Sequence, residues 1–309
     1  CPPAPPARPV LVIFASDHGV ARTARTSAYP PEVTAQMVRI LLSERAAANA
    51  LARQVGVRVR VVDVGVDAPE DYANDLGPDV AAMRIRRGSG SIDREDALTS
   101  EEADAAFALG VAIADTEIDA GADLLIAGDM GIGNTTSASA IVGLLAPAEV
   151  TSVVGRGTGI DDHTWMRKTG AVRDAMRRGK AHKAAPLDLI ATIGGPDIAA
   201  MLGFLLEAAA RRTPVILDGT VPTAAALIAH RAAYKSRDWL LAGHRSTEPA
   251  HSAALGRLDL EPLLDLRMRL GEGTGALLAV PLIAAAAAAL GEMLTFTEAG
   301  VSTAEEPAE

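Results

Sequence analysis

The chain has 309 residues, of which 49% are hydrophobic and 22% are charged, and its formal net charge is -10. This composition is typical of a globular protein with a large core, built as one large or two ordinary domains. Because the chain is acidic and only 3% aromatic, we expect no binding to nucleic acid or to anionic membranes. The single cysteine, Cys1, excludes an intrachain disulfide and favours a reducing, cytoplasmic location. No Cys/His cluster has zinc spacing, so we expect no metal site.

The N-terminal part of the chain alternates apolar runs with helical patterns. Residues 10–15 (VLVIFA) predict a strand buried on both faces, and the polar pair 17–18 (Asp-His) follows it as a site loop or an ordinary turn. A single helix is predicted over residues 31–54, because proline is tolerated in a first helical turn, and a second strand over residues 57–66. Residues 68–100 lack a long periodicity, and we expect a long loop that serves as a lid or a dimer element.

The next strand leads into a glycine-rich turn. A helix with a capping box is predicted over residues 99–120 and a strand over residues 123–127, before the turn 128–137 and a helix over residues 138–145. The free N–H groups of such a turn and the dipole of the following helix favour an anion. The turn is therefore a candidate phosphate site, with a plain tight turn as the alternative. Its glycines match a dinucleotide fingerprint poorly, and it lacks the lysine of a P-loop.

A second junction of the same kind follows. Residues 150–154 (VTSVV) predict a short strand, and the loop 155–162 after it has a glycine spacing that also fits a methyltransferase loop. Arg156 in this loop is either a clamp for a phosphate group or an ordinary surface arginine. The basic, amphipathic helix predicted over residues 163–178 is expected to be a solvated face.

The last third of the chain continues the alternation. Two helices are predicted within residues 184–212, on either side of a Gly-Gly-Pro break. They are followed by a strand over residues 214–217, a helix over 222–233, a strand over 239–242 and a helix over 249–256. The long, alanine-rich segment 276–296 predicts a core helix, and residues 303–309 predict an acidic tail in solvent.

Glu272 stands out because it lies between Gly271 and Gly273 at the start of the final helix. Glycine lets the backbone approach a ligand closely, so a glutamate held there can act as a base or orient a ligand. The alternative is an acidic residue that is simply favoured by the dipole at a helix N-terminus.

The alternating elements predict an α/β fold with a doubly wound, mostly parallel sheet and a smaller helical subdomain from chain-terminal segments. We assign residues 9–262, with the loop 68–100, to the α/β core of one catalytic unit. The helix 31–54 and residues 263–302 form a helical cap. Ligands bind beyond the carboxyl ends of parallel strands, so one site built from several loops is expected. The apolar runs end at Asp17, Asp129, Gly155, Asp218 and His244.

Eight short stretches, in this order, resemble the nicotinate-nucleotide–dimethylbenzimidazole phosphoribosyltransferase family, which makes the lower-ligand nucleotide of cobalamin. Each stretch alone is a weak signal, but together they are specific and cover nearly the whole chain. They are residues 17–20 (DHGV), 29–38 (YPPEVTAQMV), 128–136 (GDMGIGNTT), 155–161 (GRGTGID), 193–203 (IGGPDIAAMLG), 217–219 (LDG), 243–249 (GHRSTEP) and 270–275 (LGEGTG).

The resemblance implies a reaction. A nitrogen of the benzimidazole attacks C1′ of nicotinate mononucleotide, nicotinate leaves, and a ribotide of inverted, α configuration forms. Glu272 corresponds to the general base of the LGEG motif. Desolvation beside an apolar aromatic substrate raises the pKa of such a carboxyl group, whereas a helix N-terminus lowers it.

The resemblance also implies substrate-binding residues. The nucleotide phosphate is expected at Gly131, Gly133, Asn134 and Thr135. The rest of the nucleotide pocket is expected at Gly155, Arg156 and Asp218. The wall for the aromatic base is expected to include Ser27, Gln36, Leu270 and Gly271, and Asp129, where the family usually has Glu, is expected to contact substrate. Family members are homodimers without a metal or redox cofactor, so a homodimer and no cofactor are expected here.

Two other functions remain open. A nucleotide-dependent oxidoreductase or methyltransferase would explain the glycine loops. However, the acidic residue about 20 positions after the first loop, Glu149, lies near a predicted strand start and fits a ribose-binding role poorly. A non-catalytic nucleotide-binding paralogue would explain the shorter side chain of Asp129.

Overall fold

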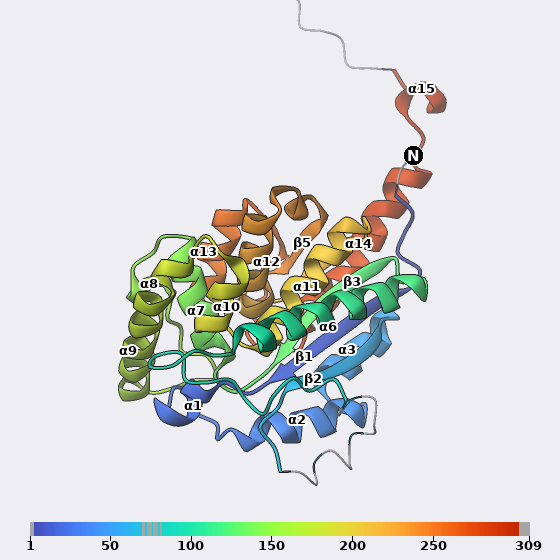
Figure 1. Cartoon of the computed structure of the whole chain (residues 1–309). Helices are drawn as coiled ribbons and strands as arrows, with labels where there is room; N and C mark the ends of the chain where they lie inside the picture. Colours follow the sequence, from blue (N-terminus) through green and yellow to red (C-terminus); the bar gives the residue numbers. More distant parts are fainter. Residues whose placement is uncertain (1–2, 70–71, 73–75, 77–79, 81, 303–309) are drawn as a thin grey trace, which may run out of the picture.

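A sheet of six strands forms the centre of the computed structural model, which describes residues 3–69, 72, 76, 80 and 82–302 (Figure 1). The strands are β1 (Pro9–Ser16), β2 (Arg58–Gly65), β3 (Leu124–Met130), β4 (Val215–Leu217), β5 (Leu240–His244) and β6 (Pro262–Leu264). They lie in the order β2-β1-β3-β4-β5-β6, and all neighbours are parallel. The chain runs from β1 outward to β2 and returns to the other side of β1 with β3, so the order reverses between β1 and β3. The predicted doubly wound α/β fold is confirmed.

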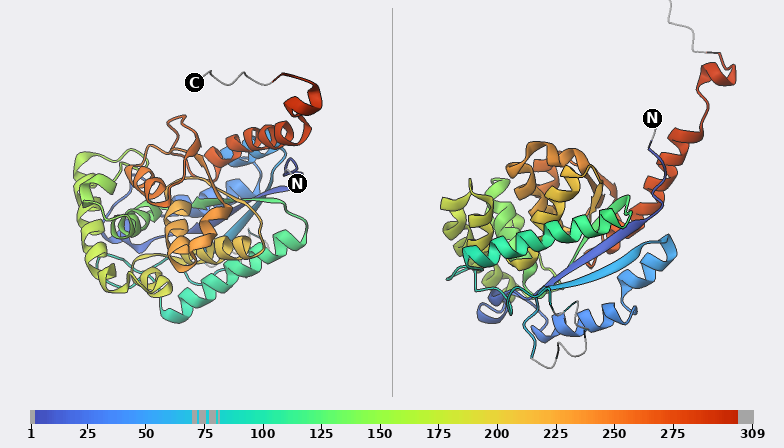
Figure 2. Two further views of the ribbon diagram at one scale, coloured as in Figure 1. Left: turned by 90° about the horizontal axis from the view of Figure 1, so that it is seen from above. Right: turned by 45° about the vertical axis from the view of Figure 1, so that its right-hand side comes forward.

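Helices cover both faces of this sheet (Figure 2). One face carries α6 (Ser100–Asp119), α7 (Asn134–Leu145), α9 (Asp162–Gly179), α10 (Pro186–Ile193), α11 (Pro196–Ala210), α12 (Thr220–Ala232) and α13 (Pro249–Leu258). The other face carries α2 (Glu32–Leu42), α3 (Ala47–Val55) and α14 (Thr274–Glu292). Strand β1 contributes Val10, Val12 and Phe14 to the first core and its alternate residues to the second, because successive side chains of a strand point to opposite faces.

Two predicted elements are wrong. The helix predicted over residues 31–54 is two helices, since α2 ends at Leu42 and the chain turns through Glu44, which has a left-handed φ of 61°, before α3 begins. The strand predicted over residues 150–154 is the short helix α8 (Val150–Val153). Valine favours strands, but β3 is flanked by β1 and β4, so the sheet leaves no place beside β3 for another strand.

The final helix, α14, is a core helix only in its first half. Residues 274–280 are mostly buried, whereas the second half projects from the body, as the right-hand view of Figure 2 shows. The helix is long and apolar enough to cross a membrane, with 39% of it buried. Because its first seven residues pack into the core, the remaining residues 281–292 are too few for a span of about 20 residues. The exposed apolar side chains here and just beyond are Leu282, Leu290, Met293, Leu294, Phe296 and Val301.

The helices of the predicted cap, α2, α3 and α14, share the second core, and α3 packs against α14. The division of the chain into a core and a cap stays a prediction. The acidic tail at residues 303–309 lies outside the described residues, as does part of the predicted loop 68–100.

Candidate active site

A cleft opens at the carboxyl ends of β3, β4 and β5, where the parallel sheet predicts a ligand site. Its volume is about 870 Å³, which includes solvent at its mouth. Residues at and just beyond the ends of three strands line it: 129–135 at β3, 218–221 at β4, and His244, Ser246 and Glu248 at β5. The loops that contain Arg156 and Leu270 complete the wall.

The glycine loop predicted to bind phosphate lines this cleft. Gly131, Gly133, Asn134 and Thr135 all lie on its wall, at the N-terminus of α7. Gly133 is the N-cap residue of α7, has a φ of 96°, and as a glycine supplies no side chain to cap this end of the helix. A Cβ atom at Gly131 would overlap the carbonyl oxygen of Ser16, so only glycine fits there. The end of α7 therefore offers backbone N–H groups and the positive end of a dipole to an anion.

Lys168 is a buried cation in this cleft that the sequence analysis missed. Its side chain lies on α9, is 2% exposed, and donates a hydrogen bond of 2.9 Å from Nζ to Oγ1 of Thr135. Burial lowers the pKa of Lys168, and the charge of Glu248 opposes this shift. The expectation that helix 163–178 is simply a solvated face is wrong at this residue. The helical spacing in the sequence could have identified it. Lys168 precedes the buried residues Ala171 and Val172 by three and four positions, and so lies on the apolar stripe of the helix.

Arg156, the predicted phosphate clamp, lines the cleft but is already engaged. Its guanidinium donates a hydrogen bond of 2.9 Å to the carbonyl oxygen of Ile160 and forms an ion pair with Asp162. Half of its side chain is exposed. Lys168 is therefore the better placed cation for an anion at the glycine loop.

Glu248 is a second functional candidate that the sequence analysis did not single out. It is 5% exposed, its Oε1 accepts a hydrogen bond of 2.8 Å from the N–H of Gly157, and its Oε2 has no partner within the described part of the chain. Gly155 does not line the cleft. Instead, it lies against the Glu248 carboxyl group, where any Cβ atom would collide with it. Gly155 thus makes room for an acceptor that faces the cleft.

Asp218 fixes the glycine frame of Glu272. Its carboxylate accepts hydrogen bonds from the N–H groups of Gly273, at 3.2 Å, Gly275, at 2.8 Å, and Ala276, at 3.0 Å. These groups lie at the start of α14, which would otherwise leave them without partners. Asp218 also lines the cleft, and its Oδ1 lies 3.4 Å from Nε2 of His244.

Glu272 lies beside the cleft rather than on its wall. The residue has a left-handed φ of 61°, and its N–H donates a hydrogen bond of 3.0 Å to the carbonyl oxygen of Asp129. Its side chain is buried. Desolvation raises the pKa of this carboxyl group, the backbone of Ala48 at the start of α3 lowers it, and the charge of Asp218 raises it. Desolvation thus outweighs the backbone contact from the start of α3. The neighbours Leu270 and Gly271 do line the cleft.

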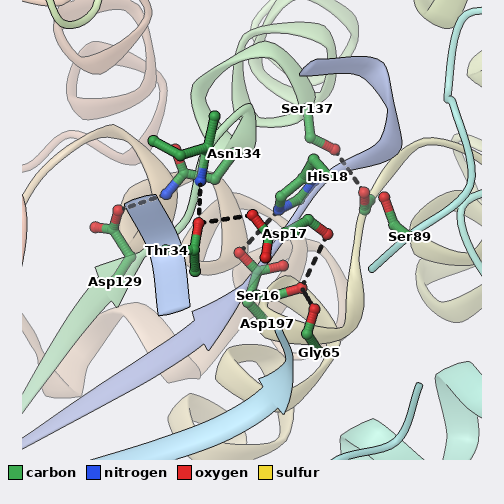
Figure 3. Close-up of polar contacts among 12 residues, drawn as sticks. Ser16, Asp17, His18, Thr34, Gly65, Ser89, Asp129, Asn134, Ser137 and Asp197 are labelled. Carbon is green, nitrogen blue, oxygen red and sulfur yellow. Dashed lines mark hydrogen bonds and ion pairs between the residues drawn. The ribbon is translucent and has the colours of Figure 1, made fainter. Parts of the chain in front are cut away.

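Asp129 is an acidic side chain of the cleft that titrates near neutral pH. Burial raises its pKa to about 8, and the charges of Asp218, Asp197 and Glu272 act in the same direction. The side-chain N–H of Asn134 donates a hydrogen bond of 2.7 Å to Asp129 Oδ2 and lowers the pKa (Figure 3). Asp129 can therefore hold or release a proton near neutral pH.

The predicted wall for the aromatic base is only partly brought together. Ser27, Leu270 and Gly271 all line the cleft. Gln36 lies on α2 and does not line the cleft. Its assignment rested on the family resemblance alone, and it stays a prediction.

Comparisons with known proteins agree with this geometry. A phosphoribosyltransferase family model matches residues 1–301. The nicotinate-nucleotide–dimethylbenzimidazole phosphoribosyltransferase of Mycobacterium marinum is 57% identical over 98% of this chain and 83% of its own length. That of Mycobacterium avium is 57% identical over 98% of this chain and 85% of its own length. The crystal structure of CobT from Thermus thermophilus has a TM-score of 0.89 and 44% identity, over 96% of this chain and 87% of that one.

A second structure from the same organism, of its nicotinate-nucleotide–dimethylbenzimidazole phosphoribosyltransferase, has a TM-score of 0.87 and 42% identity, over 97% of this chain and 87% of that one. These matches do not favour the oxidoreductase or methyltransferase alternative. The chain belongs to the nicotinate-nucleotide–dimethylbenzimidazole phosphoribosyltransferase family.

Proposed function

We propose that this protein transfers the phosphoribosyl group of nicotinate mononucleotide to 5,6-dimethylbenzimidazole or a related base. The products are nicotinate and α-ribazole 5′-phosphate, a precursor in cobalamin biosynthesis. One observation carries this proposal: a glycine loop with a buried lysine, suited to an anion, and the buried carboxyl group of Asp129 line the same cleft, with the buried carboxyl group of Glu272 beside it. A phosphorylated nucleotide and a proton-bearing aromatic base need these two features side by side.

The phosphate of the nucleotide would bind at the start of α7. The N–H groups after Gly133 and the ammonium of Lys168 supply the positive charge there. Glu248, with one unsatisfied acceptor oxygen, is suited to the ribose hydroxyl groups. With the nucleotide held in this way, C1′ lies between the glycine loop and the wall of Leu270 and Gly271.

The chemistry at C1′ exchanges one C–N bond for another. The unprotonated ring nitrogen of the benzimidazole forms a bond to C1′, while the bond from C1′ to the pyridine nitrogen breaks and nicotinate leaves with the electron pair. The other ring nitrogen then carries a proton that must be removed. We assign this proton transfer to Glu272, whose buried carboxyl group has the raised pKa that a general base requires. Asp129 is the second candidate, because its side chain lines the cleft.

Turnover by the purified protein tests the function directly. With nicotinate mononucleotide and dimethylbenzimidazole, chromatography should show nicotinate and the α-ribotide appearing in equal amounts. If the nucleotide binds and no product forms with this base or with a panel of purines and phenols, the protein is a binding paralogue. Tighter binding of NAD or of a methyl donor than of nicotinate mononucleotide would support the other alternative.

We also propose that the protein is a cytoplasmic homodimer. The exposed apolar side chains of the second half of α14 and the segment after it form a surface that a second copy would cover. Light scattering should give twice the chain mass. Leu290→Asp should give the single-chain mass, whereas Met166→Asp, which changes an exposed apolar side chain on α9, should not. A cytoplasmic location rests on the single cysteine and is tested by cell fractionation.

A further inference from the structure

The glycine loop rests directly on the end of β1. The N–H of His18 donates a hydrogen bond of 3.2 Å to the carbonyl oxygen of Ile132, the central residue of the loop. A Cβ atom at Gly133 would lie 3.1 Å from Cβ of His18, and one at Gly131 would overlap Ser16. The loop therefore has no space to shift toward β1, and its position follows that of residues 16–18.

The other side of the loop is tied to α2 by one hydroxyl group. Oγ1 of Thr34 accepts a hydrogen bond of 3.1 Å from the N–H of Ile132 and donates one of 2.6 Å to Oδ1 of Asp17 (Figure 3). The second oxygen of Asp17, Oδ2, accepts a hydrogen bond of 2.9 Å from the N–H of Asp67. Thr34 is 0% exposed and Asp17 is 4% exposed, so water does not replace these bonds readily.

The side chain at position 34 has two hydrogen-bond partners to satisfy. The side chain at position 34 must accept from a main-chain N–H and donate to a carboxylate at the same time, within a buried space. The hydroxyl group of serine or threonine does both with a single oxygen atom. The residue at position 17 must accept from a hydroxyl and from a backbone N–H, which an ionised carboxylate does with its two oxygens. Neither Thr34 nor Asp17 lines the cleft.

We infer that Thr34 and Asp17 are positioning residues that hold the glycine loop in its phosphate-binding geometry. The inference rests on the proposed function for the identity of the ligand. Through the Ile132 N–H they fix the plane of the peptide between Gly131 and Ile132. This orients the following N–H groups at the start of α7 toward the phosphate. They should therefore govern affinity for the phosphate group and not for the remainder of the nucleotide.

The test compares two ligands that differ only in the phosphate. Calorimetry would give the Kd of nicotinate mononucleotide and of nicotinate riboside for the wild-type protein and for Thr34→Val, Thr34→Ser and Asp17→Asn. Thr34→Val keeps the volume and removes the hydroxyl group. It should weaken binding of the mononucleotide about tenfold, the loss of roughly one hydrogen bond, and leave the riboside within about twofold. Thr34→Ser should restore the wild-type value, and Asp17→Asn should weaken the mononucleotide selectively.

Thr192→Val is the matched control, because Thr192 is a buried helical threonine whose hydroxyl donates to its own helix, at the carbonyl oxygen of Asp188. It should change neither Kd. Equal weakening of both ligands by Thr34→Val, or no weakening of either, would overturn the inference. Binding does not require turnover. A wild-type protein that binds the mononucleotide and releases no nicotinate would refute the proposed reaction, while these variants still decide the role of Thr34 and Asp17.

Discussion

The ammonium of Lys168 lies 2.9 Å from the hydroxyl oxygen of Thr135, in the first turn of α7 directly after the glycine loop. This pairing places a buried cation beside the N-terminus of α7, and both act on the same anion. Glu248 lies near enough for its charge to raise the pKa of Lys168. The site thus places two charged groups near the glycine loop. The ammonium of Lys168 is suited to a phosphate, and the carboxylate of Glu248 is suited to hydroxyl groups.

Removing this cation should weaken nucleotide binding. Lys168→Met retains the length of the side chain and removes the charge, and a hydrogen bond to a charged group contributes about 1.5–3 kcal/mol. The Kd of nicotinate mononucleotide should therefore rise about 10- to 100-fold. Lys180→Met, at an exposed position after α9, is the matched control and should have no effect. An unchanged Kd in Lys168→Met would remove Lys168 from the phosphate site.

The raised pKa of Asp129 predicts how pH changes stability. The folded carboxyl has a pKa of about 8 and the unfolded one its ordinary value of 3.8, so the unfolded chain releases its proton first as pH rises. Stability is therefore lost between these two values and is lowest above about pH 8. The difference between a pKa of 3.8 and one of about 8 corresponds to about 5 kcal/mol, so Asp129→Asn, which cannot ionise, should be more stable than the wild type at pH 8 by up to that amount, with little difference at pH 4. Thermal unfolding at both pH values measures this, and an equal difference at both would contradict it.

Asp17 predicts a separate effect of pH on binding. Burial raises its pKa to about 6, so it is ionised above that pH and protonated below it. Protonation removes an acceptor, so wild-type affinity for nicotinate mononucleotide should fall below about pH 6. The phosphate group itself titrates near pH 6, and the ratio of wild-type to Asp17→Asn affinities removes that contribution. A ratio that is constant between pH 5 and 8 would rule out the effect.

Several charged groups surround Asp17 and affect how this ratio of affinities changes with pH. His18 lowers the pKa of Asp17, and Asp67 raises it through its charge. His18 is paired with Asp197, and Asp67 with Arg22 and Arg87. Measuring the same ratio in a His18→Gln background removes the imidazole next to Asp17 and should leave the fall of the ratio at low pH in place.

The sequence predicted the strands that lie at the centre of the sheet because continuous apolar runs have few other stable arrangements. It also predicted the glycine loop, since glycines between a strand and a helix serve a conformation that other residues avoid. It failed at residues 150–154, where valines favour a strand but the sheet has no vacant neighbour beside β3. Whether a strand can be added beside β3 depends on the order of strands that are distant in the sequence. A local pattern of residues does not contain that order.

The sequence predicted the loop residues of the site but missed Lys168, which a helix contributes. Lys168 lies on α9, outside the glycine motifs, and only its position on the apolar stripe distinguished it from the solvated lysines. The role of Thr34 depends on contacts with Asp17 and Ile132, which are 17 and 98 residues away in sequence. Glu272 was singled out by its glycines, but the burial that raises its pKa and the backbone of Ala48 on α3 that lowers it both depend on the packing of segments that are distant in the sequence.

A turnover assay of wild type, Glu272→Gln and Asp129→Asn tests most directly whether the protein transfers the phosphoribosyl group and whether Glu272 is the base. Nicotinate release and α-ribotide formation from nicotinate mononucleotide and dimethylbenzimidazole would be followed together. We expect turnover by wild type and a loss of about 10²- to 10⁴-fold in Glu272→Gln, with the Kd of the nucleotide unchanged. Wild-type turnover that Glu272→Gln retains and Asp129→Asn loses would transfer the role of base to Asp129. No turnover by wild type with any base would contradict the proposed function itself.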